Sequence, residues 1–160
     1  MSRLIPGLVM VALLACGCAA SPAAGTGSGD QAGPKVIVAA RPLHGAGTVL
    51  VTAKGYALYM FEPDGRKMVT CTGACAGTWP PLRLPAGATL VAGRGVDTSL
   101  LASDPDPAGG RVITYSGWPL YTYSGDVQPG QVTGQAIDLN GGEWYLMRPS
   151  GRPLIPSPQS

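Results

Sequence analysis

The chain carries the same alternation of apolar and polar positions twice. Residues 55–64 (GYALYMFEPD) and residues 117–126 (GWPLYTYSGD) place a glycine, an aromatic, a leucine, a tyrosine, a second aromatic and an aspartate at matching positions. Each copy follows a strand-like run, 48–52 (TVLVT) in the first and 111–115 (RVITY) in the second, after a short turn that contains glycine. The pattern predicts a β-hairpin that is used twice.

Within each predicted strand, alternate side chains face opposite sides of the sheet. Tyr59 and Phe61 then share one face, as do Tyr121 and Tyr123. The other face carries Leu58 and Met60, matched by Leu120 and Thr122. We expect one face to pack the core and the aromatic face to form a second core layer or a half-exposed stripe. The alternative is a stacking platform of tyrosines for a sugar, a lipid headgroup or a planar cofactor.

Asp64 and Asp126 occupy the same place in the two copies, just past the end of a predicted strand. An aspartate in this position usually accepts hydrogen bonds from backbone N–H groups of a turn. A catalytic pair of carboxylates is the alternative that the internal symmetry suggests. The sequence spacing does not give the distance between the two side chains, so both interpretations remain open here.

The rest of the pattern also favours strands and turns. Residues 78–79 and 143–145 form a weaker shared ending to the two copies. After the N-terminal segment, only residues 96–103 (VDTSLLAS) are compatible with a helix, of one or two turns at most. We therefore expect an all-β fold in which two tandem hairpin-based repeats pack into one small sandwich or barrel-like domain.

The N-terminus has the pattern of an export signal. A positive start at Arg3 precedes an apolar run, residues 4–14 (LIPGLVMVALL), which is shorter than the roughly 20 residues of a membrane-spanning helix. The sequence LLAC that ends at Cys16 resembles the lipobox of bacterial lipoproteins, and the sequence that ends at Cys18 fits less well. We expect lipidation at Cys16 (or Cys18), since two acyl chains anchor a protein stably. An ordinary cleaved signal is the alternative.

Polar segments rich in glycine and proline flank the repeats. Residues 19–34 contain no aromatic and no long aliphatic side chain, so they cannot bury enough surface to offset their ordering entropy. The sequence places the start of the folded domain at Lys35 or at Gly45 and does not decide between them. We divide the chain into a lipoprotein signal peptide (1–15), the lipidated cysteine with a flexible, disordered tether (16–45), a duplicated β domain (46–149) and a disordered proline-rich tail (150–160).

The repeated motif is similar to that of a known family. The pattern Tyr-x-aromatic-x-x-Asp, followed by CTGACxxxWPPL at residues 71–82 and by a glycine-rich segment ending in Trp144 and Tyr145, resembles the "secreted repeat of unknown function" family. Its motif residues here are Tyr59, Phe61 and Asp64, then Tyr121, Tyr123 and Asp126. The resemblance spans about residues 48–147 and implies a bacterial, often actinobacterial, lipoprotein. It brings no established activity.

The remaining cysteines, Cys71 and Cys75, are separated by three small residues. Outside the cytoplasmic membrane, two thiols this close should be oxidised, so we predict a structural disulfide. A redox-active dithiol is a second interpretation, although thioredoxin-type motifs have two intervening residues and no basic residue lies nearby to lower a thiol pKa. A metal or haem site is a third: two sulfurs need two further ligands, and His44 lies outside the repeats, but Met60, Met68 and Met147 could add soft thioether ligands for copper(I).

Composition and motifs narrow the function classes. The formal net charge of +2 is too small for a surface that tracks phosphates, so we expect no nucleic-acid partner. No nucleophile elbow, dinucleotide-binding glycine motif, P-loop or zinc-protease motif occurs, and we expect no catalytic residues, no cofactor and no metal. The leading hypothesis is a lipid-anchored, extracytoplasmic, non-enzymatic binding or envelope protein. The alternative is an electron-transfer or metal- or haem-handling lipoprotein that uses Cys71, Cys75 and the tyrosine-rich face.

Overall fold

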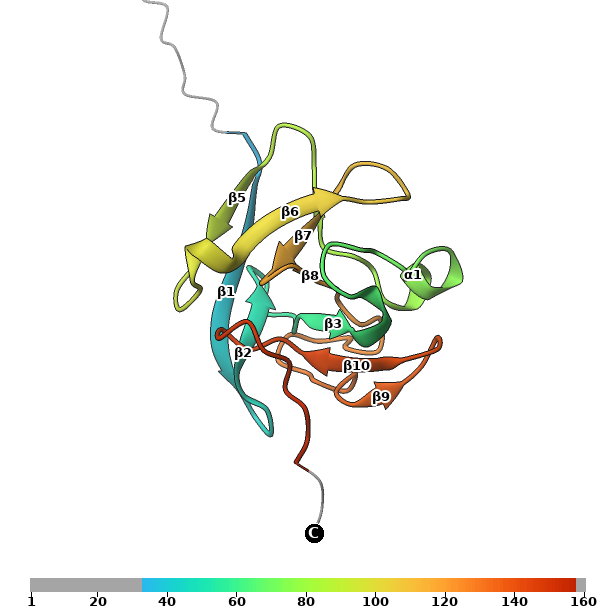
Figure 1. Ribbon diagram of the computed structural model, residues 1–160. Coiled ribbons are helices and arrows are strands. Elements are labelled where there is room, and N and C mark those ends of the chain that lie inside the picture. Colours follow the sequence, from blue (N-terminus) through green and yellow to red (C-terminus); the bar gives the residue numbers. More distant parts are fainter. Residues whose placement is uncertain (1–32, 158–160) are drawn as a thin grey trace, which may run out of the picture. The chain divides into compact units, whose positions relative to one another are not determined.

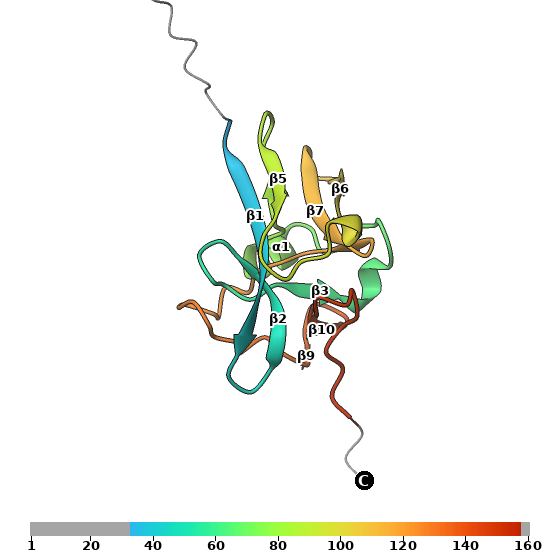
Figure 2. The same ribbon diagram turned by 90° about the vertical axis from the view of Figure 1, so that its left-hand side faces the viewer.

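The computed structural model describes residues 33–157 and forms three small β-sheets (Figures 1 and 2). The first sheet has the order β2-β1-β5, the second β3-β10-β9, and the third β4-β7-β6 with β8 paired to β7. All pairings are antiparallel except that of β1 with β5, where Lys35 lies opposite Thr89. The strands are β1 (Lys35–Leu43), β2 (Gly47–Thr52), β3 (Tyr59–Phe61), β4 (Arg83–Leu84), β5 (Thr89–Ala92), β6 (Leu101–Pro105), β7 (Arg111–Tyr115), β8 (Trp118–Pro119), β9 (Ile137–Asp138) and β10 (Glu143–Leu146).

The two predicted hairpins are present. After β2 the chain turns back, and an antiparallel β-bridge pairs Val51 with Ala57. Next to it, the Leu58 N–H donates to the Leu50 carbonyl at 2.9 Å. In the second copy, β7 pairs with β8, and the Leu120 N–H donates to the Ile113 carbonyl at 3.0 Å. The all-β fold class predicted from the sequence is therefore confirmed.

Each repeat is completed by the segment that follows the other repeat. Met147, after the second repeat, lies between Leu50 and Leu58 of the first, accepting from the Leu50 N–H at 2.8 Å and donating to the Leu58 carbonyl at 3.0 Å. The matching residues in the other half are Leu82, Ile113 and Leu120, with hydrogen bonds of 2.8 Å. The duplicated domain therefore has approximate two-fold symmetry with exchanged segments.

The symmetry axis passes between Tyr59 and Tyr121. Their backbones pair antiparallel, and each N–H donates to the carbonyl of the other residue at 2.9 Å. Strand β10 pairs with β3, which brings Trp144 opposite Phe61. In the other half, the Thr122 N–H donates to the Pro80 carbonyl at 3.0 Å. These links join the two repeats through their central strands.

The alternation of side chains divides the core into two clusters. The leucine cluster is built on Val38, Leu50, Leu58, Met60, Ile113, Tyr115, Leu120, Tyr145 and Met147. The aromatic cluster is built on Val49, Ala57, Tyr59, Phe61, Cys71, Trp79, Tyr121, Trp144 and Leu146. The predicted faces of the two repeated strands are therefore correct, and the aromatic face is a second core layer.

The ordered domain extends further than the predicted boundaries at both ends. Residues 35–43, assigned from the sequence to the flexible tether (16–45), form β1, the longest strand, because they have partners on both edges. Residues 150–155 were assigned to the tail, yet the Leu154 N–H donates to the Leu146 carbonyl at 2.8 Å, and the Leu154 side chain packs against the aromatic cluster. Cys16, Cys18 and most of the tether lie outside the described residues.

The prediction for helices was correct in part, since residues 96–103 contain one helical turn but a second helical segment was not expected. The segment 96–103 forms only the 3₁₀ turn η2 (Thr98–Leu100) before entering β6. The one α-helix of the described residues is α1 (Ala74–Thr78), which begins inside the loop that Cys71 and Cys75 close and extends beyond it. A second 3₁₀ turn, η1 (Glu62–Asp64), follows β3. Among residues 33–157 no helix has the length and apolar character needed to cross a membrane.

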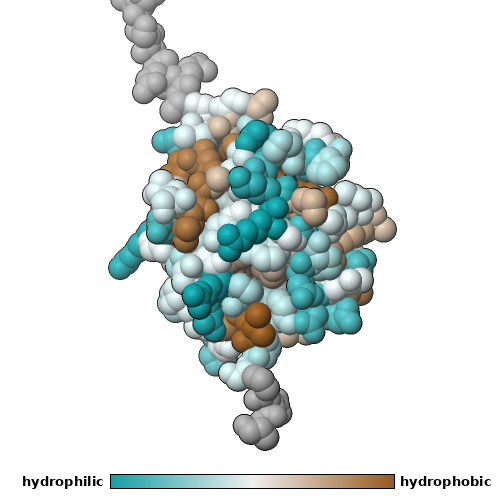
Figure 3. Space-filling model, viewed as in Figure 1, coloured by the Kyte–Doolittle hydropathy of each residue, from teal (hydrophilic) through white to brown (hydrophobic). Residues whose placement is uncertain are grey.

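The surface shows scattered apolar side chains. On the face seen in Figure 3, hydrophilic atoms predominate and apolar atoms gather over β5. The most exposed large apolar residues of the described chain are Met68, Val127, Leu139 and Ile155, and they lie in different loops. Single exposed apolar residues are normal for a soluble surface and identify no interface.

We predict that a chain ending at Pro149 is less stable than one ending at Ser157. The shorter chain loses the bridge between Met147 and Pro153 and the packing of Leu154, which together should cost about 1–2 kcal/mol of unfolding free energy. Urea denaturation of both truncated chains measures the difference. Equal stability of the two truncated chains would show that residues 150–157 are a tail that does not stabilise the domain.

Candidate functional site

The two repeats exchange their motif tyrosines and aspartates. The Tyr59 hydroxyl donates to Oδ2 of Asp126 at 2.7 Å, and the Tyr121 hydroxyl donates to Oδ2 of Asp64 at 2.5 Å. All four residues are buried. Each repeat therefore supplies the donor of one pair and the acceptor of the other, so neither copy of the motif is complete without its partner.

The second oxygen of each carboxylate binds a threonine from its own repeat. Oδ1 of Asp64 accepts from the backbone N–H and the hydroxyl of Thr70, both at 2.7 Å. Oδ1 of Asp126 accepts from the same groups of Thr133 at 2.8 and 2.6 Å. The predicted bond from each aspartate to a backbone N–H is confirmed. With three donors on each carboxylate, the two aspartates have a structural role.

Burial sets the protonation of these pairs. Loss of solvent, then the hydrogen bond to a carboxylate and its negative charge, raise the pKa of Tyr59 and of Tyr121 far above the ordinary value. Burial also raises the pKa of Asp64, although the hydrogen bonds from Tyr121 and Thr70 act in the opposite direction. The two hydroxyls therefore keep their protons throughout the physiological range.

Four aromatic rings form a continuous stack across the symmetry axis. Trp79 and Trp144 lie face to face at the centre, with ring centroids 3.9 Å apart and an interplanar angle of 0°. Phe61 stacks on Trp144 at 4.1 Å, and Tyr123 stacks on Trp79 at 4.2 Å. Each motif therefore contributes its second aromatic residue to one end of the stack.

The central tryptophans differ in one respect. The indole N–H of Trp144 donates to the Leu139 carbonyl at 2.9 Å, whereas the buried indole N–H of Trp79 has no hydrogen-bond partner in the described chain. The chain before Trp79 differs from that before Trp144, since it is the helical turn α1, whose Cys75 carbonyl bonds the Trp79 backbone N–H. The symmetry is thus broken on the side of Trp79.

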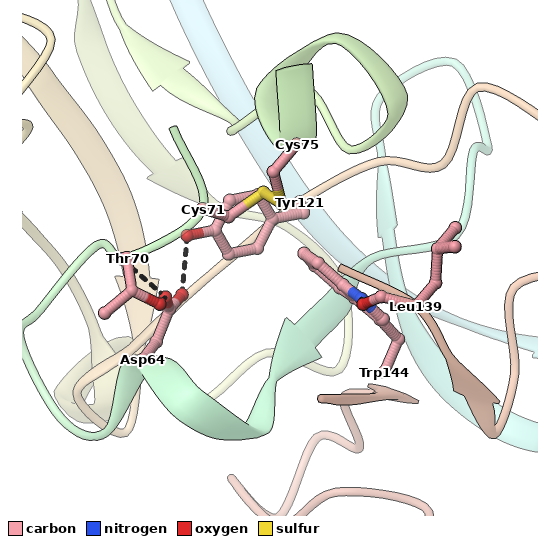
Figure 4. Close-up of a disulfide and its surroundings, with 7 residues drawn as sticks. All are labelled: Asp64, Thr70, Cys71, Cys75, Tyr121, Leu139 and Trp144. Atoms are coloured by element: carbon pink, nitrogen blue, oxygen red, sulfur yellow. Dashed lines mark hydrogen bonds between the residues drawn. A yellow bond between two sulfur atoms is a disulfide. The ribbon is translucent and has the colours of Figure 1, made fainter. Parts of the chain in front are cut away.

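Cys71 and Cys75 form the predicted disulfide, and their Cα atoms are 5.2 Å apart. Cys71 is buried in the aromatic cluster with Tyr121 and Trp144, and Cys75 packs against that cluster. Figure 4 shows this group together with the hydrogen bond between Tyr121 and Asp64. The bridge closes a short turn, residues 71–75, within the connection from the first repeat to its exchanged segment.

The soft metal ligands considered from the sequence do not meet. Met60 and Met147 belong to the leucine cluster and Cys71 to the aromatic cluster, while Met68 is 60% exposed. His44 lies exposed in the turn between β1 and β2. Among the residues that the structure describes, no three His, Cys, Asp or Glu side chains are placed to hold a metal ion.

An open groove of about 460 Å³ lies beside the second repeat, and we call it the β1 groove. Its lining comes from β1, from the turn after β2, from Leu82 and from residues 122–124 of the second repeat (Lys35, Val36, Ile37, Thr52, Ala53, Lys54, Tyr56, Leu82, Thr122, Tyr123, Ser124 and Asp126). Its volume falls in the range of small-molecule sites, roughly 300–1,000 Å³.

The β1 groove lies where the two repeats differ. Thr122 and Tyr123 are half-buried and line it, whereas Met60 and Phe61, at the matching positions of the first repeat, are 2% and 3% exposed. Thr122 is smaller and more polar than Met60, and Tyr123 adds a hydroxyl to the ring that Phe61 provides, and both are less deeply buried than their counterparts. Tyr123 is also the last ring of the aromatic stack, which holds it in place.

Several residues of this region were missed by sequence reasoning. Thr70 and Thr133 follow their aspartates at slightly different spacings, which hides their equivalence. The stacking of Trp79 on Trp144 could have been suspected from the weak shared ending at residues 78–79 and 143–145. The groove itself depends on β1, whose residues were assigned from the sequence to the flexible tether.

The motif tyrosines Tyr59 and Tyr121 form no exposed platform, because both are fully buried.

The comparisons with known proteins agree with this duplicated architecture. A family model described as "Secreted repeat of unknown function" matches residues 44–83 and residues 104–147, which together make up more than half of the chain. Each match contains one copy of the motif and the segment after it. No curated protein and no solved structure matches the chain.

We predict that Tyr59→Phe and Tyr121→Phe each lower the unfolding free energy by about 1–3 kcal/mol, because each leaves a buried carboxylate with one donor fewer. Urea denaturation at pH 7 measures the loss. Tyr56→Phe is the control, since the structure gives the Tyr56 hydroxyl no hydrogen bond among the described residues. Variants as stable as the control would show that the exchanged pairs contribute nothing net.

The same tyrosines should make stability fall at alkaline pH. Their pKa is raised in the folded state, whereas an unfolded tyrosine ionises near pH 10. The unfolded state therefore loses protons that the folded state keeps, and stability decreases as the pH rises above about 10. Denaturation from pH 8 to 11 should show a shallower decline in the double variant Tyr59→Phe/Tyr121→Phe than in the wild type.

We predict that Trp144→Phe is more destabilising than Trp79→Phe by about 1 kcal/mol. Both substitutions remove the same part of a fully buried ring, but only the first removes an indole hydrogen bond, to the Leu139 carbonyl. Denaturation of the two variants side by side tests this. A greater loss for Trp79→Phe would mean that its N–H has a partner in solution.

Loss of the disulfide should cost about 2 kcal/mol by the chain-entropy relation for a loop of this length. For a domain of this size, that corresponds to a fall in melting temperature of roughly 10 °C. The measurement compares melting with and without reductant, and the variant Cys71→Ala/Cys75→Ala should not respond to reductant. Free thiols in protein taken from cells would contradict a structural role.

Proposed function

This chain belongs to the family of secreted repeats of unknown function, and we propose that it is a lipid-anchored, extracytoplasmic, non-enzymatic protein that binds a ligand in the β1 groove. The family name indicates a secreted protein. The apolar run at residues 4–14 followed by the lipobox at Cys16, with Cys18 as the other candidate, supports attachment to the outer face of the cell membrane.

The observation that carries the binding function is the departure from symmetry at the groove. The motif residues are used in the core, where the tyrosine–aspartate pairs and the ring stack join the repeats. Such a rigid interior can position a surface site. The polar Thr122 lines the groove in the second repeat, where the first repeat has the buried Met60.

The anchor is tested with the double variant Cys16→Ser/Cys18→Ser. It should lose lipid labelling and leave the membrane fraction, and the two single variants assign the modified residue. Retention of the double variant on membranes, with its signal peptide removed, would contradict lipid anchoring. Detergent-free washes at high salt should release only proteins held by charge, so the wild type should stay bound.

The binding function is tested with Thr122→Met, which gives the second repeat the residue of the first. The larger side chain should fill part of the groove while the fold is kept, because a methionine is accommodated at the matching position. Wild type and variant are purified from native membranes, and the small molecules that accompany them are compared by mass spectrometry. The same compounds in both samples would argue against a site in the groove.

Electron transfer remains a second candidate because of one observation. The four stacked rings run from Phe61 to Tyr123, which lines the groove, with centroid separations of 3.9 to 4.2 Å. An absorption spectrum, a metal analysis and a thiol assay of protein taken from the envelope distinguish the two functions. A Soret band, a bound metal or two free thiols would favour electron transfer over simple binding.

A further inference from the structure

The charges around the β1 groove are unbalanced. Lys35 and Lys54 line it, both are exposed, and neither forms an ion pair among residues 33–157. The acidic residue of the lining is Asp126, whose two oxygens already accept from Tyr59 and Thr133. Asp126 is buried and forms no ion pair with either lysine among the described residues, so the lining carries two cations against one carboxylate.

The neighbouring surface adds to the positive charge. A second hollow shares Ile37 and Ala53 with the β1 groove, and its lining includes Arg41 and Arg94 but no acidic residue. Four cationic side chains therefore follow the same side of β1 and the turns beside it. A surface of this kind attracts anions and raises their local concentration.

Between the cations, the groove offers apolar and aromatic surface. Val36, Ile37 and Leu82 are half-buried in its lining, and the ring of Tyr123 is held at one side by its stacking on Trp79. Tyr56 provides a second half-buried ring. An apolar body of small-molecule size can contact these side chains while an acidic group stays beside the lysines.

We propose that the β1 groove binds a small anionic amphiphile, a molecule with an apolar or aromatic body and one acidic group. The apolar body lies against Ile37, Leu82 and the ring of Tyr123, and the acidic group contacts Lys35 and Lys54. This assignment rests on the proposed binding function and names the chemical class of its ligand. The charge pattern distinguishes it from a neutral apolar molecule, for which the lysines would have no role.

The experiment uses two fluorescent probes that differ in charge. The anionic probe 8-anilinonaphthalene-1-sulfonate and the uncharged N-phenyl-1-naphthylamine share the same aromatic body. Both are titrated into a protein of residues 32–160, which contains all of the described residues and both core clusters. The variants are Lys35→Glu/Lys54→Glu, the groove-filling Thr122→Met, and Lys67→Glu/Arg152→Glu, which makes the same change in net charge away from the groove.

The wild type should bind the anionic probe more tightly than the uncharged one. Lys35→Glu/Lys54→Glu should lower the affinity for the anionic probe by about tenfold or more. The same variant should change the affinity for the uncharged probe less than about twofold. Lys67→Glu/Arg152→Glu should leave both affinities near those of the wild type, and Thr122→Met should weaken both probes. Circular dichroism and melting curves confirm that each variant is folded.

The outcomes separate the two levels of the proposal. If Thr122→Met leaves both probes bound, the groove is not the site and the proposed function fails with it. If Thr122→Met weakens both probes but Lys35→Glu/Lys54→Glu does not discriminate between them, the groove is the site and the anionic class is wrong. If Lys67→Glu/Arg152→Glu lowers the affinity for the anionic probe as much as Lys35→Glu/Lys54→Glu does, the effect comes from net charge alone and the assignment is overturned.

Discussion

The fold depends on a buried hydrogen bond made twice, between a tyrosine hydroxyl of one repeat and an aspartate carboxylate of the other. A carboxylate without partners is costly to bury, and a tyrosine hydroxyl without an acceptor is also unfavourable. Here each group satisfies the other only when the two repeats are correctly paired. The motif therefore carries information about the assembly of the two halves as well as about the local hairpin, because a misaligned pairing would leave both carboxylates one donor short.

Around these pairs, the aromatic residues fill the interface with large rigid surfaces. Tyr59 meets Trp79 edge-on at 5.4 Å, and Tyr121 meets Trp144 in the same way at 5.1 Å. The edge-to-face contacts use a geometry that aromatic pairs prefer, whereas the central stack brings the rings of Trp79 and Trp144 closer together, with centroids 3.9 Å apart. A chain with so much glycine and proline has few other means of making a stable core, and it concentrates its aromatic side chains where the two repeats meet.

Local features were predictable from the sequence, and long-range ones were not. The period of two placed Tyr59 and Leu58 on opposite faces, and the spacing of Cys71 and Cys75 indicated their bridge. Which tyrosine binds which aspartate depends on the pairing of distant strands. The spacing within one motif contains no information about that pairing. Strand β1 (Lys35–Leu43) was missed because its stability comes from partners on both edges. Helix α1 was missed because a helix of five residues depends on tertiary contacts more than on propensity.

The exchange of trailing segments has an evolutionary consequence. A single copy of the repeat could not satisfy its own tyrosine, aspartate or open strand edge, but two separate copies could do so as a symmetric homodimer, which is the commonest form of protein association. In such a dimer, every substitution occurs on both sides of the axis. Joining the copies in one gene removes that restriction. Only then can one position hold the buried Met60 and its equivalent the groove-lining Thr122, so that one half maintains the scaffold while the other is free to acquire a binding site.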